Sequence, residues 1–575
     1  MTDARIDAAG PLPWPRLPAL RWGFLLMIGL IGSMGFLVLY PLVVILINSF
    51  NEASIVHEPV YGFGAWREAF GAPGVWRALK NTVDVAVVRQ LITFPLGVLI
   101  AWVLARTNIP FSRGFEFLFW ISFMYPTVAT VFGWMLLLDP DTGLVNSVFQ
   151  SWFGTSPFNI YSFWGIIWVH VISGIDTKVM LLTPVFRRMD AAMEEASRMS
   201  GGGTFSTMMR VTLPVMTPAL IVVLMLSLVR LFESFEVEYL IGAPWGFYVL
   251  STKIVDLVRS EPPMINQAAA LGSIVLMFLV VMIPLQRWLI GRRTFVTVTS
   301  QMKLKIIEIG VWRWVVAGGL MLLISMSVVV PVLSVAGGAF MTRFGFFHLP
   351  QTWTLEYWEN ALTNPGLISS LENTLIIAGS AALIGTVVFS LTAYVLVRTK
   401  LPGRGILDAI CWLPSAVPGV LLGLGLLWMF LGTPIFRPLY GSISLLIIGS
   451  ILGGVTLSTQ ILKANFIQLG PQLEEASRMS GAGFWRTYWR VVVPLMAQSL
   501  ILTAILKFLF AARNASTVIF LSTSETRPLS VLALDQIAAG YHEEASITVF
   551  LIILLTTGLA IAARICGLNI GVRDQ

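Results

Sequence analysis

The sequence contains few of the residues that form polar surfaces, disulfides and metal sites. Of its 575 residues, 12% are charged, four are histidines and two are cysteines. A soluble chain of this length would fold into several domains, each with a charged surface, and so little charge cannot supply them. Cys411 and Cys566 both lie in apolar segments, and the histidines have no ligand spacing. We therefore expect neither a disulfide nor a bound metal.

Long apolar runs take the place of polar surface. The chain is 56% hydrophobic and its mean hydropathy is +0.82. Continuous runs of about 18 or more apolar residues predict membrane-spanning helices. We therefore predict an all-α polytopic membrane protein with twelve spans. The first six are at 22–47, 83–105, 115–138, 160–183, 212–232 and 267–290. The second six are at 312–336, 372–397, 406–431, 441–464, 492–512 and 545–566.

The basic residues indicate the orientation of these spans. Arginines and lysines precede the first span and gather between spans two and three, between spans four and five, and between the two sets of six. If the N-terminus is cytoplasmic, every one of these segments is cytoplasmic, as the positive-inside rule requires. The net charge of +7 therefore reflects topology, and we expect no nucleic-acid partner.

The two sets of six spans are repeats of one another. "WREAFGAPGVWRALKNT" at 66–82 aligns without gaps to "WENALTNPGLISSLENT" at 358–374, an offset that continues through Arg106 and Arg398. Each copy has an even number of spans, so both keep the same orientation and are parallel repeats, which enclose a path between them. The predicted units are a first half at 1–290, a basic cytoplasmic linker at 291–311 and a second half at 312–575.

One polar stretch occurs almost unchanged in both halves. It reads "EEASRMSGGG" at 194–203 and "EEASRMSGAG" at 474–483. Helix formers followed by glycine predict a helix, a tight turn and a second helix, with a positive φ at Gly201 and Gly481. A single copy would fit equally well a helix that lies on the lipid headgroups. Two copies, kept while the surrounding spans diverge, favour two equivalent docking partners.

Both stretches resemble the E-A-A loop of permeases from binding-protein-dependent ABC importers. That loop reads E-A-A, three residues, G, nine residues and I-x-L-P, and here serine replaces the second alanine and valine the isoleucine in both copies. A fused two-half permease of this length resembles the ferric-iron, thiamine and 2-aminoethylphosphonate branch, and the resemblance covers nearly the whole chain. The matching positions in loops 187–214 and 467–494 are Glu195, Ala196, Ser197, Gly201, Pro214, Glu475, Ala476, Ser477, Gly481 and Pro494.

The resemblance implies the type I importer fold and separate subunits for transport and for ATP hydrolysis. Each loop would be a coupling helix seated in one of two copies of an ATP-binding subunit, which would bind the ATP and Mg. This chain has no G-x-x-x-x-G-K-[ST] phosphate loop, so we expect no catalytic residues and no cofactor of its own. The resemblance also implies a multi-pass protein of the bacterial cytoplasmic (inner) membrane, surrounded by lipid, that receives its substrate from a periplasmic binding protein.

Charged residues and one asparagine at the fifth span of each half are the candidates for the translocation path, because polar and charged groups inside a membrane are costly. Fixed ion pairs that lock helices together explain them equally well. The candidates are Arg230, Glu233 and Glu236 in the first half and Lys507, Arg513 and Asn514 in the second.

These residues do not identify the substrate. Ferric iron is the first candidate only because of the branch that the chain resembles, and 2-aminoethylphosphonate, thiamine and polyamines remain alternatives. A secondary transporter would also fit twelve spans in two parallel halves. It is the weaker hypothesis, because a self-contained carrier has no need of two coupling loops.

Overall fold

The computed structural model describes residues 18–53, 58–190, 192–229, 234–291, 306–347 and 349–565, and these contain helices and no strand longer than an isolated bridge. The first-half α-helices are α1 (Pro18–Asn48), α2 (Gly64–Gly71), α3 (Val75–Arg106), α4 (Ser112–Met124), α5 (Thr127–Leu138), α6 (Leu144–Phe153), α7 (Phe163–Arg187), α8 (Ala192–Met199), α9 (Thr204–Thr207), α10 (Leu213–Val229), α11 (Leu250–Arg259) and α12 (Ile265–Gly291).

The second half repeats this order. Its α-helices are α13 (Trp312–Ile324), α14 (Val330–Gly338), α15 (Glu356–Thr363), α16 (Pro365–Arg398), α17 (Arg404–Trp412), α18 (Gly419–Gly432), α19 (Ile443–Gly453), α20 (Val455–Gln468), α21 (Gln472–Met479), α22 (Phe484–Thr487), α23 (Val493–Leu495), α24 (Ala497–Arg513), α25 (Leu529–Ala538) and α26 (His542–Ile565).

The predicted all-α polytopic class is confirmed. Among the described residues, 7 helices are long and apolar enough to cross a membrane, and four bent pairs of helices raise the number to 11. The remaining predicted span, 267–290, falls on α12. The described first part of this helix, Ile265–Phe278, is apolar but too short to cross a membrane by itself.

Four of the predicted spans are not continuous helices, and to that extent the prediction was wrong. The spans at 115–138, 406–431, 441–464 and 492–512 are bent by 94°, 111°, 52° and 78°. The causes are local backbone breaks, of which three involve proline or paired glycines.

Proline breaks the third span of each half. Tyr125 and Val417 are extended, with ψ of 138° and 123°, because each precedes a proline, Pro126 or Pro418, that disfavours the helical conformation of its neighbour. The break between α19 and α20 falls at the Gly453–Gly454 pair, where glycine favours a chain interruption. The fourth bend lies at Met496, which leaves the helix two residues after Pro494.

The two halves interlock through their first spans. Helix α1 packs against α17 and α18 of the second half, and α14 packs against α5 of the first half. Equivalent glycines allow the close approach: a Cβ added to Gly133 would lie 2.6 Å from Pro331 Cα, and one added to Gly425 would lie 2.7 Å from the Pro41 carbonyl oxygen. Each half therefore supplies a helix to the other.

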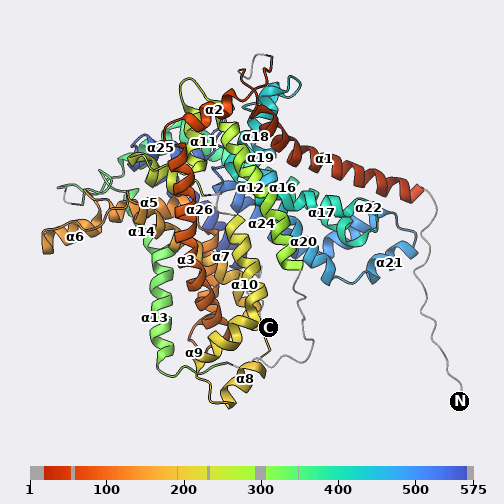
Figure 1. Cartoon of the computed structure of the whole chain (residues 1–575), viewed down its shortest axis with the longest axis horizontal. Coiled ribbons are helices and arrows are strands. Elements are labelled where there is room, and N and C mark those ends of the chain that lie inside the picture. Colours follow the sequence, from red (N-terminus) through yellow and green to blue (C-terminus); the bar gives the residue numbers. More distant parts are fainter. Residues whose placement is uncertain are drawn as a thin grey trace.

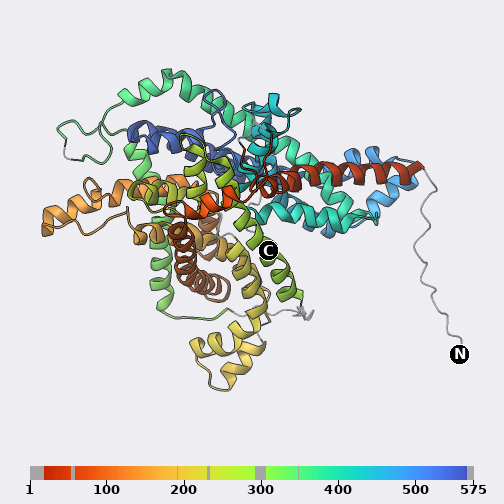
Figure 2. The same cartoon turned by 45° about the horizontal axis from the view of Figure 1, so that its top comes forward.

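This exchange gives the molecule two diverging arms (Figure 1). One arm contains α3, α7, α10 and α13 and ends at α8, while the other contains α16, α17, α20 and α24 and ends at α21. Helix α1 runs along the second arm in both views (Figures 1 and 2). Each repeated loop is thus carried at the end of an arm that contains helices from both halves.

Candidate functional site: two repeated loops and a central cavity

Both repeated loops form the same short helix and the same turn. Helices α8 and α21 are each eight residues long. Gly201 and Gly481 follow them with φ of +84° and +80°, so the predicted positive φ is confirmed. In the first loop the Gly202 N–H donates to the Ser197 carbonyl at 2.9 Å, which is the Schellman end of a helix that glycine permits.

A buried ion pair fixes the first loop helix to a membrane span. Arg106 is the last residue of α3 and donates to the carboxylate of Glu194 in α8, and their side chains are 0% and 6% exposed. Thr212 Oγ1 donates to the other carboxylate oxygen of Glu194 at 2.7 Å. Because a buried charge needs a partner and hydrogen bonds, α8 is tied to α3 and to the segment that enters α10.

The second loop helix is fixed in the same way. Arg398, the last residue of α16, donates to Glu474 in α21 at 2.9 Å. Tyr394 adds a hydrogen bond to Glu474 at 2.8 Å and accepts one from Arg478 at 2.9 Å. The Arg–Glu pair is therefore a feature of both repeats.

The serines that depart from the E-A-A pattern have a structural role. Ser197 Oγ lies 2.9 Å from Thr207 Oγ1, and Ser477 Oγ lies 3.0 Å from Thr487 Oγ1. These hydrogen bonds join each loop helix to the short helix that follows it. The serine and its partner threonine occur together in both halves.

A π-helical turn leads from each loop into the fifth span. It covers Met208–Thr212 in the first half and Tyr488–Val492 in the second. Pro214 and Pro494 each follow directly, as the second residue of α10 and of α23. Proline has no backbone N–H and cannot donate the usual helical hydrogen bond. The turn before each proline adopts the wider π-helix, which accommodates this missing bond.

The outer faces of the two loop helices are exposed and apolar in equivalent places. Met199 and Met479 are 90% and 86% exposed, and Phe205 and Trp485 at the next helix are 70% and 53% exposed. Ala196 and Ala476 in the same loop helices are also exposed. Apolar surface left bare at matched positions is characteristic of a surface that another protein covers.

A cavity of about 1200 Å³ lies between the two halves. Its walls combine first-half residues from α4, α7 and α10 with second-half residues from α17–α20 and α24. Four of the predicted path residues line it, namely Glu236, Lys507, Arg513 and Asn514. Arg230 and Glu233 lie outside the described residues, so their place on the translocation path stays a prediction.

Arg513 connects the halves at the edge of this cavity. Its guanidinium donates to the carbonyls of Phe123 and Tyr125 at 2.8 and 3.0 Å and lies over the Phe510 ring at 4.6 Å. These carbonyls end α4, where a helix leaves its last acceptors unpaired. Arg513 thus caps the broken third span of the opposite half.

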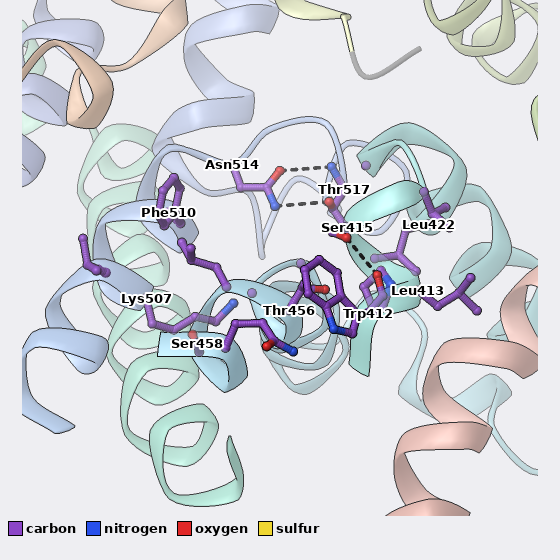
Figure 3. A pocket seen from close by; sticks show the side chains of 18 of the residues that line it. Trp412, Leu413, Ser415, Leu422, Thr456, Ser458, Lys507, Phe510, Asn514 and Thr517 are labelled. Carbon is purple, nitrogen blue, oxygen red and sulfur yellow. Dashed lines mark hydrogen bonds between the residues drawn. The ribbon is translucent and has the colours of Figure 1, made fainter. Parts of the chain in front are cut away.

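Asn514 and Lys507 occupy different parts of the second-half wall (Figure 3). Asn514 ends α24 and bonds to Thr517 through both its amide nitrogen, at 3.1 Å, and its amide oxygen, at 3.2 Å. Lys507 is 3% exposed and donates to the carbonyls of Ser450 and Ile451. In the described part of the chain, no group of three or more histidine, cysteine, aspartate or glutamate side chains could hold a metal ion.

The sequence interpretation missed the residues that fix the loops. Arg106 and Arg398 were found only as a repeated pair of arginines, and Glu194 and Glu474 only as the first letters of the polar stretch. The available signal was that an arginine and a glutamate occur at equivalent positions in each half. Charges that repeat in this way beside apolar spans indicate two equivalent contacts.

The comparisons with known proteins agree with this architecture. Residues 385–568 match the family described as "Binding-protein-dependent transport system inner membrane component". The ferric transport system permease protein FbpB of Actinobacillus pleuropneumoniae is 24% identical over 88% of this chain and 73% of its own length. A probable ABC transporter permease, y4fN, of Sinorhizobium fredii is 25% identical over 87% of this chain and 89% of its own length.

Other matches cover a smaller share of the chain. The sulfate transport system permease CysT of Escherichia coli is 28% identical over 30% of this chain and 65% of its own length. A solved bacterial ABC transporter that imports alginate is 20% identical, with a TM-score of 0.42 over 48% of this chain and 98% of that chain. By the family match and by the relatives that span most of it, the chain is similar to permeases of the binding-protein-dependent ABC importer type.

Proposed function

We propose that this permease imports a solute by alternating access and that its two repeated loops couple the movement to two ATP-binding subunits. In this proposal α8 and α21 each seat in a cleft of one subunit. Closure of the ATP-bound pair draws the two loops together and turns the cavity outward, and hydrolysis returns it. The nucleotide chemistry belongs to the partner subunits, which bind ATP and Mg.

The observation that carries the proposal is the equivalence of the two loop helices. Each ends at a glycine with positive φ, and each is tied to the second span of its half by a buried Arg–Glu pair. Each also exposes a methionine almost completely. A helix that is rigidly joined to a membrane span and exposed on its outer face can transmit the movement of a partner subunit to that span.

The orientation belongs to the same proposal. The loops face the cytoplasm, where ATP is available, because their basic residues follow the positive-inside rule. The N-terminus is then cytoplasmic, the membrane is the bacterial inner membrane, and the opposite face receives a periplasmic binding protein.

Ferric iron is the first candidate cargo, because a relative that spans most of this chain is named a ferric transport permease. An organic solute such as 2-aminoethylphosphonate, thiamine or a polyamine is the alternative. The hydrogen-bond donors around Lys507 favour a solute that carries an anionic group. Secondary transport is the weakest candidate, because a secondary transporter has no partner subunit that would cover the exposed loop helices.

The test is ATP hydrolysis and uptake by proteoliposomes that contain this chain, its ATP-binding subunit and its binding protein. We expect Glu195→Lys with Glu475→Lys to lower both activities by at least about tenfold, equivalent to a loss of roughly 1.4 kcal/mol in coupling. The matched control is Glu356→Lys, which reverses an exposed charge on α15 and should change neither. Full uptake in the double variant would contradict the proposal.

A further inference from the structure

The second-half wall of the cavity contains a buried ammonium group that forms no ion pair with a carboxylate of the described residues. Lys507 lines the cavity at 3% exposure, and its ammonium donates to the carbonyls of Ser450 and, at 3.3 Å, of Ile451. None of the ion pairs among the described residues includes Lys507. A buried charge balanced only by backbone carbonyls is costly, and a bound anion would offset that cost.

Two further donors on the same wall have no partner. The hydroxyl of Ser450, a residue that is 1% exposed, and the amide nitrogen of Gln460 both line the cavity and make no hydrogen bond in the described part of the chain. Buried polar groups are nearly always paired, so these two residues of the cavity wall keep hydrogen-bonding capacity that a ligand could use. Figure 3 shows Lys507 extending toward the side of the cavity where Ser458 and Thr456 lie.

The chemistry of these groups indicates whether the ligand carries a positive or a negative charge. An ammonium, a hydroxyl and an amide N–H₂ all donate, and charge-assisted donation to an oxyanion is the strongest use of such a set. A bare metal cation would instead need several carboxylates. Of the described residues that line the cavity, Glu236 is the one acid.

We propose that Lys507, Ser450 and Gln460 form an oxyanion subsite in the translocation cavity. The group that binds there is a phosphonate, phosphate, sulfate or carboxylate. The inference rests on the proposed import function and narrows its cargo, which is either an anionic solute or a metal carried inside an anionic chelate.

The first experiment measures anion binding to the whole complex of permease and ATP-binding subunits in lipid nanodiscs. The probes are radiolabelled inorganic phosphate, sulfate and citrate. We expect saturable binding of at least one probe, weakened by about tenfold or more in Lys507→Gln and partly retained in Lys507→Arg, because a charge-assisted hydrogen bond is stronger than a neutral one. Lys463→Gln is the matched control, since Lys463 pairs with Asp408 at 2.7 Å and neither residue lines the cavity.

Two outcomes would overturn the subsite. One is the absence of saturable binding of all three probes, and the other is wild-type affinity in Lys507→Gln, which would place the bound anion elsewhere. If Lys507→Gln does not assemble, Ser450→Ala removes one donor and keeps the lysine. We expect it to weaken binding by about threefold, the effect of one neutral hydrogen bond, and unchanged affinity would again contradict the proposal.

Uptake by proteoliposomes distinguishes the two sources of the anion. Transport of iron(III) with citrate, but not of 2-aminoethylphosphonate, would identify a chelate, and the reverse result would identify a free anionic solute. We expect Lys507→Gln to abolish whichever uptake occurs, whereas uptake of putrescine that is insensitive to this variant would overturn the subsite. Stimulation of ATP hydrolysis by the binding protein is recorded in parallel. Its absence would refute the import function while leaving the nanodisc result to decide the subsite.

Discussion

At the residue scale, the main feature is a pair of buried ion pairs at equivalent positions. Arg106–Glu194 and Arg398–Glu474 each join the end of a second span to a loop helix. The sequence predicted that these positions repeat, because one offset relates the arginines. It could not predict that arginine and glutamate meet, since no pattern in one chain reports a contact across 76 or 88 residues.

Removal of one partner of the first pair should destabilise the protein strongly. Arg106→Ala leaves the Glu194 carboxylate buried without its cation, and breaking such a pair costs about 3–5 kcal/mol. We expect a clear fall in the thermal unfolding midpoint of the detergent-solubilised chain. Lys80→Ala is the matched control, because Lys80 and Asp84 pair at the surface with side chains 75% and 41% exposed, and such pairs contribute about 0–1 kcal/mol. Equal effects of the two changes would contradict the assigned burial.

The turn glycines should be sensitive to any side chain. Gly201→Ala forces an alanine into φ +84°, which costs roughly 1–2 kcal/mol, and the loop should lose much of its coupling of ATP hydrolysis to uptake. Gly203→Ala is the control, because Gly203 has φ −68° and nothing within 4 Å of an added Cβ. If Gly203→Ala impaired coupling as much as Gly201→Ala, the turn conformation would not be the cause.

At the element scale, the sequence predicted the helices better than their bends. Apolar length located the spans, and Pro126 and Pro418 gave a visible signal for the broken third spans. The bend at Met496 had a weaker signal, because the equivalent first-half helix follows Pro214 without a break. The exchange of first spans had no signal, since the apolar surface of α1 does not specify which half it covers.

The close approach of α14 to α5 and of α1 to α18 predicts a packing effect. Gly133→Ala and Gly425→Ala each place a Cβ within 2.7 Å of a proline backbone atom, and overpacking costs about 1–3 kcal/mol. We expect each variant to lower the thermal unfolding midpoint. Gly379→Ala in α16, where nothing lies within 4 Å, should leave it unchanged or raise it, because alanine is the better helix former. A lower midpoint in Gly379→Ala alone would refute this packing.

At the scale of the whole molecule, two halves with equivalent loops enclose one cavity. The positions of the apolar spans, the repeat and the loops were accessible from the sequence because hydropathy and near-identity are local properties. The cavity and its donors were not, because they depend on helices from both halves. Of the predicted path residues, only those in the described part of the chain can be placed at its wall.

The exchanged first spans predict how the halves behave when they are separated. A chain cut between Thr297 and Val298, in the predicted linker, should yield two fragments that co-purify when expressed together. Each fragment alone should fail to accumulate, because its first span would lack the helices of the other half that it packs against. Co-purification is measured with an affinity tag on one fragment. A fragment that is stable and monodisperse by itself would contradict the interlocked arrangement.

The central claim, that two loops grip two ATP-binding subunits, is tested most directly by the mass of the intact complex. Native mass spectrometry of the purified assembly should give one copy of this chain with two ATP-binding subunits. Met199→Arg should leave one subunit bound, since it places a charge on one exposed loop helix only, and Met199→Arg with Met479→Arg should leave none. A wild-type assembly with a single ATP-binding subunit, or two subunits retained in the double variant, would contradict the account.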